Sequence, residues 1–162
     1  MIDIRIDNNE GHFKFRVSGT VCHKDKYLFV QMNDNPFYCL PGGHVELGEN
    51  TEDAILREME EELGFPVKIL RFVGIAQNFF EGKDKKPFHE LAFYYVVEAQ
   101  NENDLTLNDY FRLENDKGFM QRLNFKWMTL EEATNVDFRP SFILDMLKSE
   151  KEQHLIFDYR KN

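Results

Sequence analysis

Residues 43–65 read GHVELGENTEDAILREMEEELGF and are the most informative part of the chain. A glycine loop leads into a helical pattern that carries Glu58, Glu61 and Glu62. At about 100° per residue, Glu61 lies roughly 300° and Glu62 roughly 40° around the helix from Glu58, so the three carboxylates share one sector. Such crowding is unfavourable unless a cation lies among the carboxylates. Oxygen ligands select Mg²⁺ first and Mn²⁺ next, so the stretch predicts a divalent metal site.

The same stretch predicts where this helix begins and ends. Asn50 or Thr51 suits the N-cap, and acidic residues follow in the first turn, where the helix dipole favours them. Gly64 suits the position after the last helical residue, and Pro66 prevents continuation. The apolar residues that share the face expected to be buried are Ala54, Ile55, Met59 and Leu63. The glutamates flank that face, so they are expected to remain available for ligands.

The spacing within the stretch resembles the signature of the Nudix hydrolases. That signature reads Gly, five spacers, Glu, seven spacers, then Arg-Glu-apolar-any-Glu-Glu-any-Gly-apolar. All seven strict positions match: Gly43, Glu49, Arg57, Glu58, Glu61, Glu62 and Gly64. At a chance of roughly one in fifteen per position, a random start would match about once in 10⁸. Met59 and Phe65 stand where branched aliphatic residues are usual, and neither difference touches the chemistry.

The resemblance implies a fold, a reaction and a metal. The expected fold is an α/β (α+β) Nudix-type α/β/α sandwich with a mixed β-sheet, formed as a single domain over residues 1–162. The expected reaction is the hydrolysis of the diphosphate linkage in a nucleoside diphosphate joined to another group, with Mg²⁺ as cofactor and Mn²⁺ as a substitute. Divalent ions neutralise the anionic phosphates and lower the pKa of bound water.

By the same resemblance, Glu58 and Glu62 are expected to bind the metal directly. Glu61 is expected as a third ligand and as the candidate base, and the backbone carbonyl of Gly42 as a further ligand. The residues expected to be catalytic are therefore Glu61 and Glu58, together with the neighbouring Arg57.

Arg57 is expected to act through position rather than by touching phosphate. The resemblance implies that it pairs with Glu49 and props the loop against the helix, while Gly43 lets the backbone approach closely. Glu60 points away from the metal sector and is expected to be solvated.

Residues outside the stretch are weaker candidates. Glu90 and Glu114 could each supply an extra carboxylate as a metal ligand or base. Alternation along the strand places Glu90 on the same face as Ala92 and Tyr94. The candidates for substrate contacts are Arg16, Gln31, Phe80 and Arg139. The family marks for dinucleoside polyphosphate and ADP-ribose substrates are absent from residues 80–83, so the sequence leaves the substrate open.

The remaining pattern predicts alternating strands and helices. Strands are expected in the following segments: residues 13–22, 27–32, 67–80, 88–99, 123–128 and 154–160. The first two are expected to form one hairpin, and residues 67–80 and 88–99 another, across a charged turn. Two further helices are expected over residues 130–135 and 140–149, and residues 100–118 read as polar and irregular. The last strand is expected at an edge, where it could pair across a homodimer.

The composition of the chain limits the binding partners and the location to be expected. The chain has 162 residues and a formal charge of −9, which disfavours nucleic acid and anionic membranes as partners. A small nucleotide-type diphosphate is therefore the expected substrate. Cys22 and Cys39 lack the spacing of a zinc site and read as buried thiols in a reducing compartment. With no signal peptide pattern and no apolar run long enough to span a bilayer, the cytoplasm is the expected location.

Two other functions remain open from sequence. An isomerase of isoprenoid diphosphates shares this fold but depends on a catalytic cysteine and a modified signature, and only Cys39 favours that alternative. A non-catalytic sensor of nucleotide ligands would be expected to have lost carboxylates of the signature, and all of them are present.

Overall fold

The computed structural model describes residues 1–116 and 118–161. Lys117, within the segment expected to be irregular, and Asn162, at the end of the expected domain, lie outside the described residues. The strands are β1 (Arg5–Asp7), β2 (His12–His23), β3 (Lys26–Met32), β4 (Gly42–His44), β5 (Val67–Glu81), β6 (Pro87–Ala99), β7 (Tyr110–Asp116), β8 (Phe119–Met128) and β9 (Gln153–Asp158). The α-helices are α1 (Thr51–Leu63), α2 (Leu130–Ala133) and α3 (Phe142–Lys148), and short 3₁₀ helices span Glu102–Asp104 and Tyr159–Lys161.

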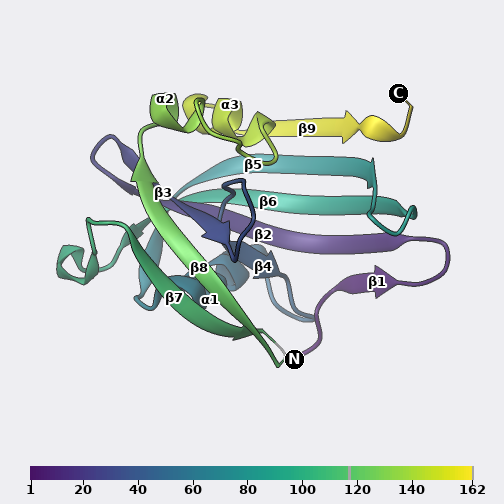
Figure 1. Cartoon of the computed structure of the whole chain (residues 1–162), viewed down its shortest axis with the longest axis horizontal. Helices are drawn as coiled ribbons and strands as arrows, with labels where there is room; N and C mark the ends of the chain where they lie inside the picture. Colours follow the sequence, from purple (N-terminus) through teal and green to yellow (C-terminus); the bar gives the residue numbers. More distant parts are fainter. Residues whose placement is uncertain (117, 162) are drawn as a thin grey trace.

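Helices cover both faces of a mixed sheet, so the expected α/β/α architecture is confirmed (Figure 1). The strand order is β7-β8-β3-β2-β6-β5-β9, with β1 and β4 each paired to β2. The β2–β6 and β5–β9 pairs are parallel, and the other pairs are antiparallel. Because β9 lies beyond β5, the expected edge strand near the C-terminus is also confirmed.

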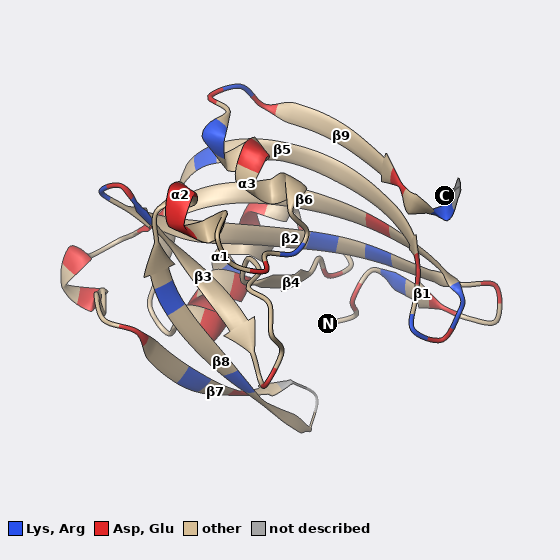
Figure 2. Ribbon diagram, turned by 45° about the horizontal axis from the view of Figure 1, so that its top comes forward, with Lys and Arg blue, Asp and Glu red and all other residues tan. Residues whose placement is uncertain are grey.

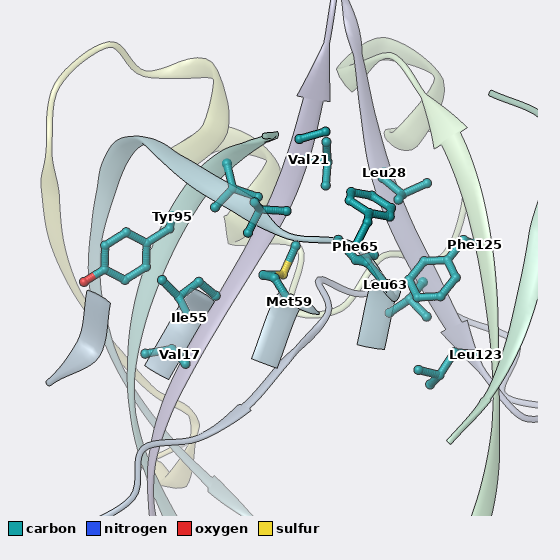
Figure 3. Close-up of a cluster of buried hydrophobic side chains, with 14 of the residues drawn as sticks. Val17, Val21, Leu28, Ile55, Met59, Leu63, Phe65, Tyr95, Leu123 and Phe125 are labelled. Carbon is teal, nitrogen blue, oxygen red and sulfur yellow. The ribbon is translucent and has the colours of Figure 1, made fainter. Parts of the chain in front are cut away.

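The alternation of side chains along the strands supplies one core on each face of the sheet. On one face, Ile55 and Met59 of α1 pack against Val17 of β2 and Tyr95 of β6 (Figure 3). On the other face, Ala92 and Tyr94 of β6 pack with residues of α2 and α3. Because neighbouring residues of β6 enter opposite cores, the sheet is buried on both sides and holds α1 in a fixed place.

Helix α1 begins and ends where its sequence predicts. The side chain of Asn50 accepts a hydrogen bond from the backbone N–H of Asp53 at 2.9 Å, so Asn50 is the N-cap. Gly64 adopts φ 84°, a left-handed conformation that favours glycine, and its N–H donates to the carbonyl of Glu60. These caps fix which turns of the helix carry the carboxylates.

Strand β2 pairs with different strands at different points along its length. At its C-terminal end, Cys22 pairs with Tyr27 of β3 in the expected hairpin. Nearer its middle, Arg16 and Ser18 pair with His44 and Gly42 of β4. Strand β3 meanwhile turns away to pair with β8. This divergence leaves the loop before α1 lying on the sheet, beside the helix.

The expectation that residues 100–118 are irregular is wrong for Tyr110–Asp116, which form strand β7. This strand pairs with β8 over its whole length and lies at the edge of the sheet. Its charged residues Arg112 and Glu114 are half-buried, with Arg112 against Gly64, whereas Phe111 and Leu113 on the opposite side are exposed. Because apolar residues normally take the buried face of a strand, this inverted pattern does not predict one. Strand β8 is correspondingly longer than the expected residues 123–128, because its first half pairs with β7.

Strands β1 and β4 were not expected, and β4 forms within the segment read as a glycine loop, because its backbone pairs with β2. The remaining strands and the α-helices agree with expectation apart from their ends. Helices α2 and α3 are shorter than the expected residues 130–135 and 140–149. None of the helices in the described part of the chain is long and apolar enough to cross a membrane.

Candidate active site

Helix α1 presents two carboxylates to the backbone of β4. The N–H of Gly42 donates a hydrogen bond to Glu62 Oε1 at 3.3 Å. Gly43 lies directly against the carboxylate of Glu58, and a Cβ at that position would collide with both oxygens of Glu58. The absence of a side chain at Gly43 therefore lets the helix and the strand approach closely enough to bring Glu58, Glu62 and Gly42 together. We call these three residues the carboxylate end of the site.

Arg57 ties the helix to the loop that precedes it. Its Nε and Nη2 donate to the two oxygens of Glu49, each at 2.8 Å, and Nη2 also donates to the carbonyl of His44 at 3.1 Å. Its Nη1 donates to Glu58 Oε1 at 2.7 Å and lies 3.6 Å from Glu61 Oε2. The bidentate contact lowers the pKa of Glu49 and fixes the planes of both groups. Arg57 thus connects the loop, the helix and the carboxylate end.

Glu62 is a buried carboxylate with other acids nearby. Burial, followed by the negative charges of Glu114 and Glu58, raises its pKa to about 8. Burial also raises the pKa of Glu58, although Arg57 opposes that shift. Strand β7, which carries Glu114, packs against α1, so this acid adds negative charge near Glu62. Glu61, in contrast, has 57% of its side chain exposed.

The donor set of the carboxylate end fits a hard divalent cation. Carboxylate oxygens and a backbone carbonyl are the ligands that Mg²⁺ and Mn²⁺ accept, and a cation there would offset the burial and mutual repulsion of the acids. Among residues 1–116 and 118–161, no three His, Cys, Asp or Glu side chains converge closely enough to hold an ion as they stand. One oxygen of Glu58 is bound by Arg57 instead.

A cavity of about 620 Å³ opens beside the carboxylate end and includes Gly42 and Glu62 in its lining. Its floor is the face of the sheet that carries Arg16 on β2, Asn78 on β5 and Glu90 on β6. We call these three residues the floor end of the site. The rest of the lining includes Phe37 and Cys39 from the segment before β4, Arg139 and Pro140 from the segment that leads into α3, and Ile143 of α3. The cavity therefore runs from the carboxylates to the polar part of the sheet.

Three of the four residues expected to contact substrate line this cavity. Arg16 donates from Nη2 to the carbonyl of Gly42 at 3.1 Å, so it spans the two ends of the site. Phe80 and Arg139 lie in the wall, with the Arg139 guanidinium 4.7 Å from the centre of the Phe37 ring. Gln31 instead lines a separate depression with Arg122.

The two candidates for an extra carboxylate lie in different places. Glu90 is at the floor end, where its Oε2 is 3.9 Å from Arg16 Nη1. It faces the same way as Ala92 and Tyr94, as alternation predicts. Glu114 instead influences the pKa of Glu62 at the carboxylate end. The structure thus separates two acids that the sequence could not distinguish.

Cys39 lines the cavity, but its thiol is not activated. Burial raises its pKa to about 11, although Arg16 opposes the shift. A thiol with such a pKa is almost entirely protonated at neutral pH and is a poor nucleophile. This observation disfavours the isomerase alternative, which depends on a reactive cysteine.

Sequence reasoning missed Asn78. This residue is the direct cross-strand partner of Glu90, in the hairpin where Glu81 pairs with Pro87. The signal was available, because the hairpin connecting residues 67–80 and 88–99 was expected, and a tight turn fixes which residues face each other. The position of the turn would have placed Asn78 beside Glu90.

The chain belongs to the NUDIX domain family, whose model matches residues 13–146. The matched segment includes strands from both sides of the site as well as α1 and its preceding loop.

Curated relatives with named activities are similar over part of their length. An ADP-ribose pyrophosphatase of Methanocaldococcus jannaschii is 30% identical over 92 residues, which are 54% of this chain and 52% of the relative. A probable DHNTP pyrophosphohydrolase of Lactococcus lactis subsp. cremoris is 33% identical over 104 residues, which are 60% of this chain and 61% of the relative. The chain thus matches only about half to three-fifths of these two relatives.

A solved structure of a MutT protein from Bacillus halodurans shares the fold. It superposes with a TM-score of 0.61 at 18% identity, covering 90% of this chain and 91% of that one. The likeness at this identity concerns architecture alone.

Proposed function

We propose that the protein is a Mg²⁺-dependent hydrolase that cleaves the diphosphate linkage of a nucleoside diphosphate derivative. The observation that carries the proposal is the grouping of Glu58, Glu62 and the Gly42 backbone beside a nucleotide-sized cavity that Gly42 and Glu62 line. Family membership and the names of relatives, which include pyrophosphatases acting on ADP-ribose and on DHNTP, support the reaction class. The substrate would be a small molecule that reaches the site through the cavity.

In this proposal Glu58, Glu62 and the Gly42 carbonyl hold the metal, with Glu61 and Glu114 as further ligands or bases. The metal, when bound, neutralises phosphate charge and lowers the pKa of a coordinated water. Arg57 contributes by position, because its contacts with Glu49 and Glu58 fix the orientation of the helix against the loop. Arg16 places a cation between the carboxylate end and the cavity, where an anionic substrate would pass.

The test is a hydrolysis panel with and without Mg²⁺. The panel contains nucleoside triphosphates, ADP-ribose, NADH, dinucleoside polyphosphates and nucleotide sugars, with products identified by chromatography and mass spectrometry. We expect turnover of at least one compound that depends on Mg²⁺ and is abolished by excess chelator.

Three glutamine variants of α1 place the activity at the proposed site. Glu61→Gln and Glu62→Gln are expected to lower turnover strongly, because each removes a carboxylate proposed as a metal ligand or base. Glu60→Gln is the matched control, since Glu60 is exposed on the same helix and should retain full activity. Full activity in Glu62→Gln would overturn the site assignment. Nucleotide binding without turnover of any compound would instead favour a sensor.

A further inference from the structure

Strand β9 forms one edge of the sheet, and its outer side is open. Among the described residues it pairs with β5 alone, in parallel, and it ends the strand order beyond β5. Figures 1 and 2 both show β9 as the outermost strand on this side of the sheet. An edge strand directs backbone N–H and C=O groups away from the sheet, and these groups can form hydrogen bonds with a further strand.

The composition of β9 does not protect this edge. Exposed edges are normally protected by Lys, by Pro or by a bulge. The strand reads QHLIFD and pairs with β5 in a regular register, so it has none of these. Ile156 at its centre is 62% exposed, while Leu155 and Phe157 point to the other face and are only half-buried beside the core under α3. Apolar side chains on both faces of an open edge suit a further strand as neighbour.

We propose that β9 pairs antiparallel with β9 of a second copy of this chain, with Ile156 opposite the partner's Ile156. A two-fold axis perpendicular to the sheet would relate the copies and join their sheets edge to edge. Residues at equal distances from the centre then face each other. Leu155 lies opposite the partner's Phe157, and His154 lies opposite the partner's Asp158. Apolar residues thus meet apolar residues, and a histidine meets an acid.

The end pair has the atoms that such a contact needs. His154 contacts Gln77 through Nε2, so Nδ1 is the ring nitrogen for the partner. The Asp158 carboxylate accepts two hydrogen bonds from Arg160 of its own chain, each at 2.8 Å. A carboxylate has about four acceptor positions, so a histidine N–H can be added to these contacts.

The neighbouring registers fit less well. Side chains that face each other must lie on the same face of the sheet, so a slip moves the centre of the pairing by a whole residue. Centring on Leu155 places His154 opposite the partner's Ile156. Centring on Phe157 places Ile156 opposite the partner's Asp158. Of the three registers, the one centred on Ile156 alone avoids a polar residue opposite this isoleucine.

The other edge of the sheet is less suited to the same pairing. In β7, Arg112 lies against Gly64 and Glu114 adds charge near Glu62, so its charged residues are engaged beside α1 of their own chain. Leu113 in the middle of β7 is nevertheless 62% exposed, as Ile156 is. Leu113 is therefore a matched control for substitutions at Ile156.

Sedimentation equilibrium over a range of protein concentrations tests the association. A pair of strands this short buries a small area, and small interfaces are weak, so we expect a reversible dimer with a Kd of about 10–100 μM. A chain that stays monomeric up to about 1 mM overturns the proposal. The outcome does not depend on the proposed function, because the carboxylate end is carried by α1 and β4. These elements contact β2, which is separated from β9 by β5 and β6.

Lysine variants distinguish the two edges. Ile156→Lys should raise the Kd of the dimer at least about 10-fold, because two like charges replace the apolar contact at the centre. Leu113→Lys makes the same change of charge at equal exposure on the other edge, and it should keep the Kd of the unmodified chain. A dimer that survives Ile156→Lys overturns the proposal, and its loss in Leu113→Lys would assign the interface to β7.

A charge exchange tests the register. His154→Asp should weaken the dimer, because it places an acid opposite the partner's Asp158. The double variant His154→Asp/Asp158→His restores unlike partners at both ends and should recover most of the affinity. No recovery in a folded double variant would contradict this register.

A cysteine at the centre decides the case if the double variant does not fold. Opposite Cα atoms in an antiparallel pair are about 4.5–5.5 Å apart, within the range of a disulfide. Ile156→Cys should therefore oxidise in air to a disulfide-linked dimer, whereas Leu113→Cys should remain largely uncrosslinked. Equal crosslinking of the two variants on a non-reducing gel overturns the register.

Discussion

At the carboxylate end, Arg57 donates hydrogen bonds to four oxygens, on Glu49, Glu58 and His44, whereas at the floor end Asn78 Oδ1 accepts none among the described residues. The first region is organised by its own chain and can hold its geometry without a ligand. The second is held by the pairing of the strands, and its side chains make fewer and longer contacts, such as the 3.9 Å approach of Arg16 Nη1 to Glu90 Oε2. The difference shows that two sets of residues on different elements line the site, and under the proposed function the contacts of one set can be disturbed without those of the other.

The largest expected effect separates activity from stability at the carboxylate end. Glu62→Gln should lower kcat by about 10³-fold, since a metal contact contributes several kcal/mol to the transition state. Its free energy of unfolding in EDTA should be unchanged or higher, because Glu62 is buried close to Glu58 and Glu114. Steady-state kinetics and urea denaturation measure the two quantities. A strong loss of stability would show that Glu62 supports the fold rather than the chemistry.

The next effect concerns the thiol in the cavity wall. With a pKa of about 11, Cys39 should react with iodoacetamide at pH 7.5 at least about 30-fold more slowly than an unperturbed thiol of pKa about 8.5. Its rate should rise about tenfold per pH unit until the pH approaches 11, because the thiolate is the reactive form. Mass spectrometry after timed alkylation distinguishes Cys39 from Cys22. Rapid reaction of Cys39 at neutral pH would restore the isomerase alternative.

A smaller effect tests how much the contacts of Arg57 stabilise the protein. Arg57→Lys should lower the free energy of unfolding by about 2 kcal/mol, because lysine cannot make the bidentate contact with Glu49. Arg5→Lys is the control, since the Arg5–Asp7 pair is largely exposed and should contribute less than about 0.5 kcal/mol. Chemical denaturation of both variants gives the comparison. Equal losses would mean that Arg57 is no more than a surface charge.

The smallest expected effect is the titration of His12, which lies away from the site. It should change the local stability near β1 without affecting either end of the site. His12 lies 2.8 Å from Asp84 and 2.7 Å from Asp7, and these hydrogen bonds raise its pKa. The stabilisation is present below the unfolded pKa of about 6.5 and is lost as the pH rises through the higher folded pKa. Hydrogen exchange near β1 should therefore be more protected at pH 6 than at pH 8, after correction for intrinsic rates. His12→Gln should remove this difference without changing catalysis, and a persisting difference would assign it to another group.

The sequence predicted the contiguous part of the site better than the dispersed part. Helix α1 and its caps could be predicted because the spacing of Asn50, Gly64 and the apolar face is local. The pairing of Arg57 with Glu49 was expected from the resemblance, and the two side chains are in contact, while their catalytic roles remain predictions. The floor end depends on strand register, which brings Asn78 beside Glu90 from positions 12 residues apart.

Strand β7 is an element that the sequence pattern did not predict. Its exposed face carries Phe111 and Leu113, and its charged residues interrupt any simple apolar run. Strand β7 is stabilised by its antiparallel pairing with β8, the next strand along the chain. The composition of the segment that joins them does not indicate a hairpin, so this pairing could not be predicted. As a result, Glu114 could be named as a candidate acid, but its approach to Glu62 could not be derived. Figure 2 shows the separation that folding produces, with acidic stretches along α1 and basic stretches on β2.

The pairing of Asn78 with Glu90 across two long strands has a consequence for how such a protein can diverge. Both positions lie in paired strands of the sheet and line the cavity, so their side chains can change while the backbone stays in place. Neither position belongs to the segment that contains Glu58 and Glu62. Exchange of this one cross-strand pair would therefore change the polar lining of the cavity and leave the segment that contains Glu58 and Glu62 untouched.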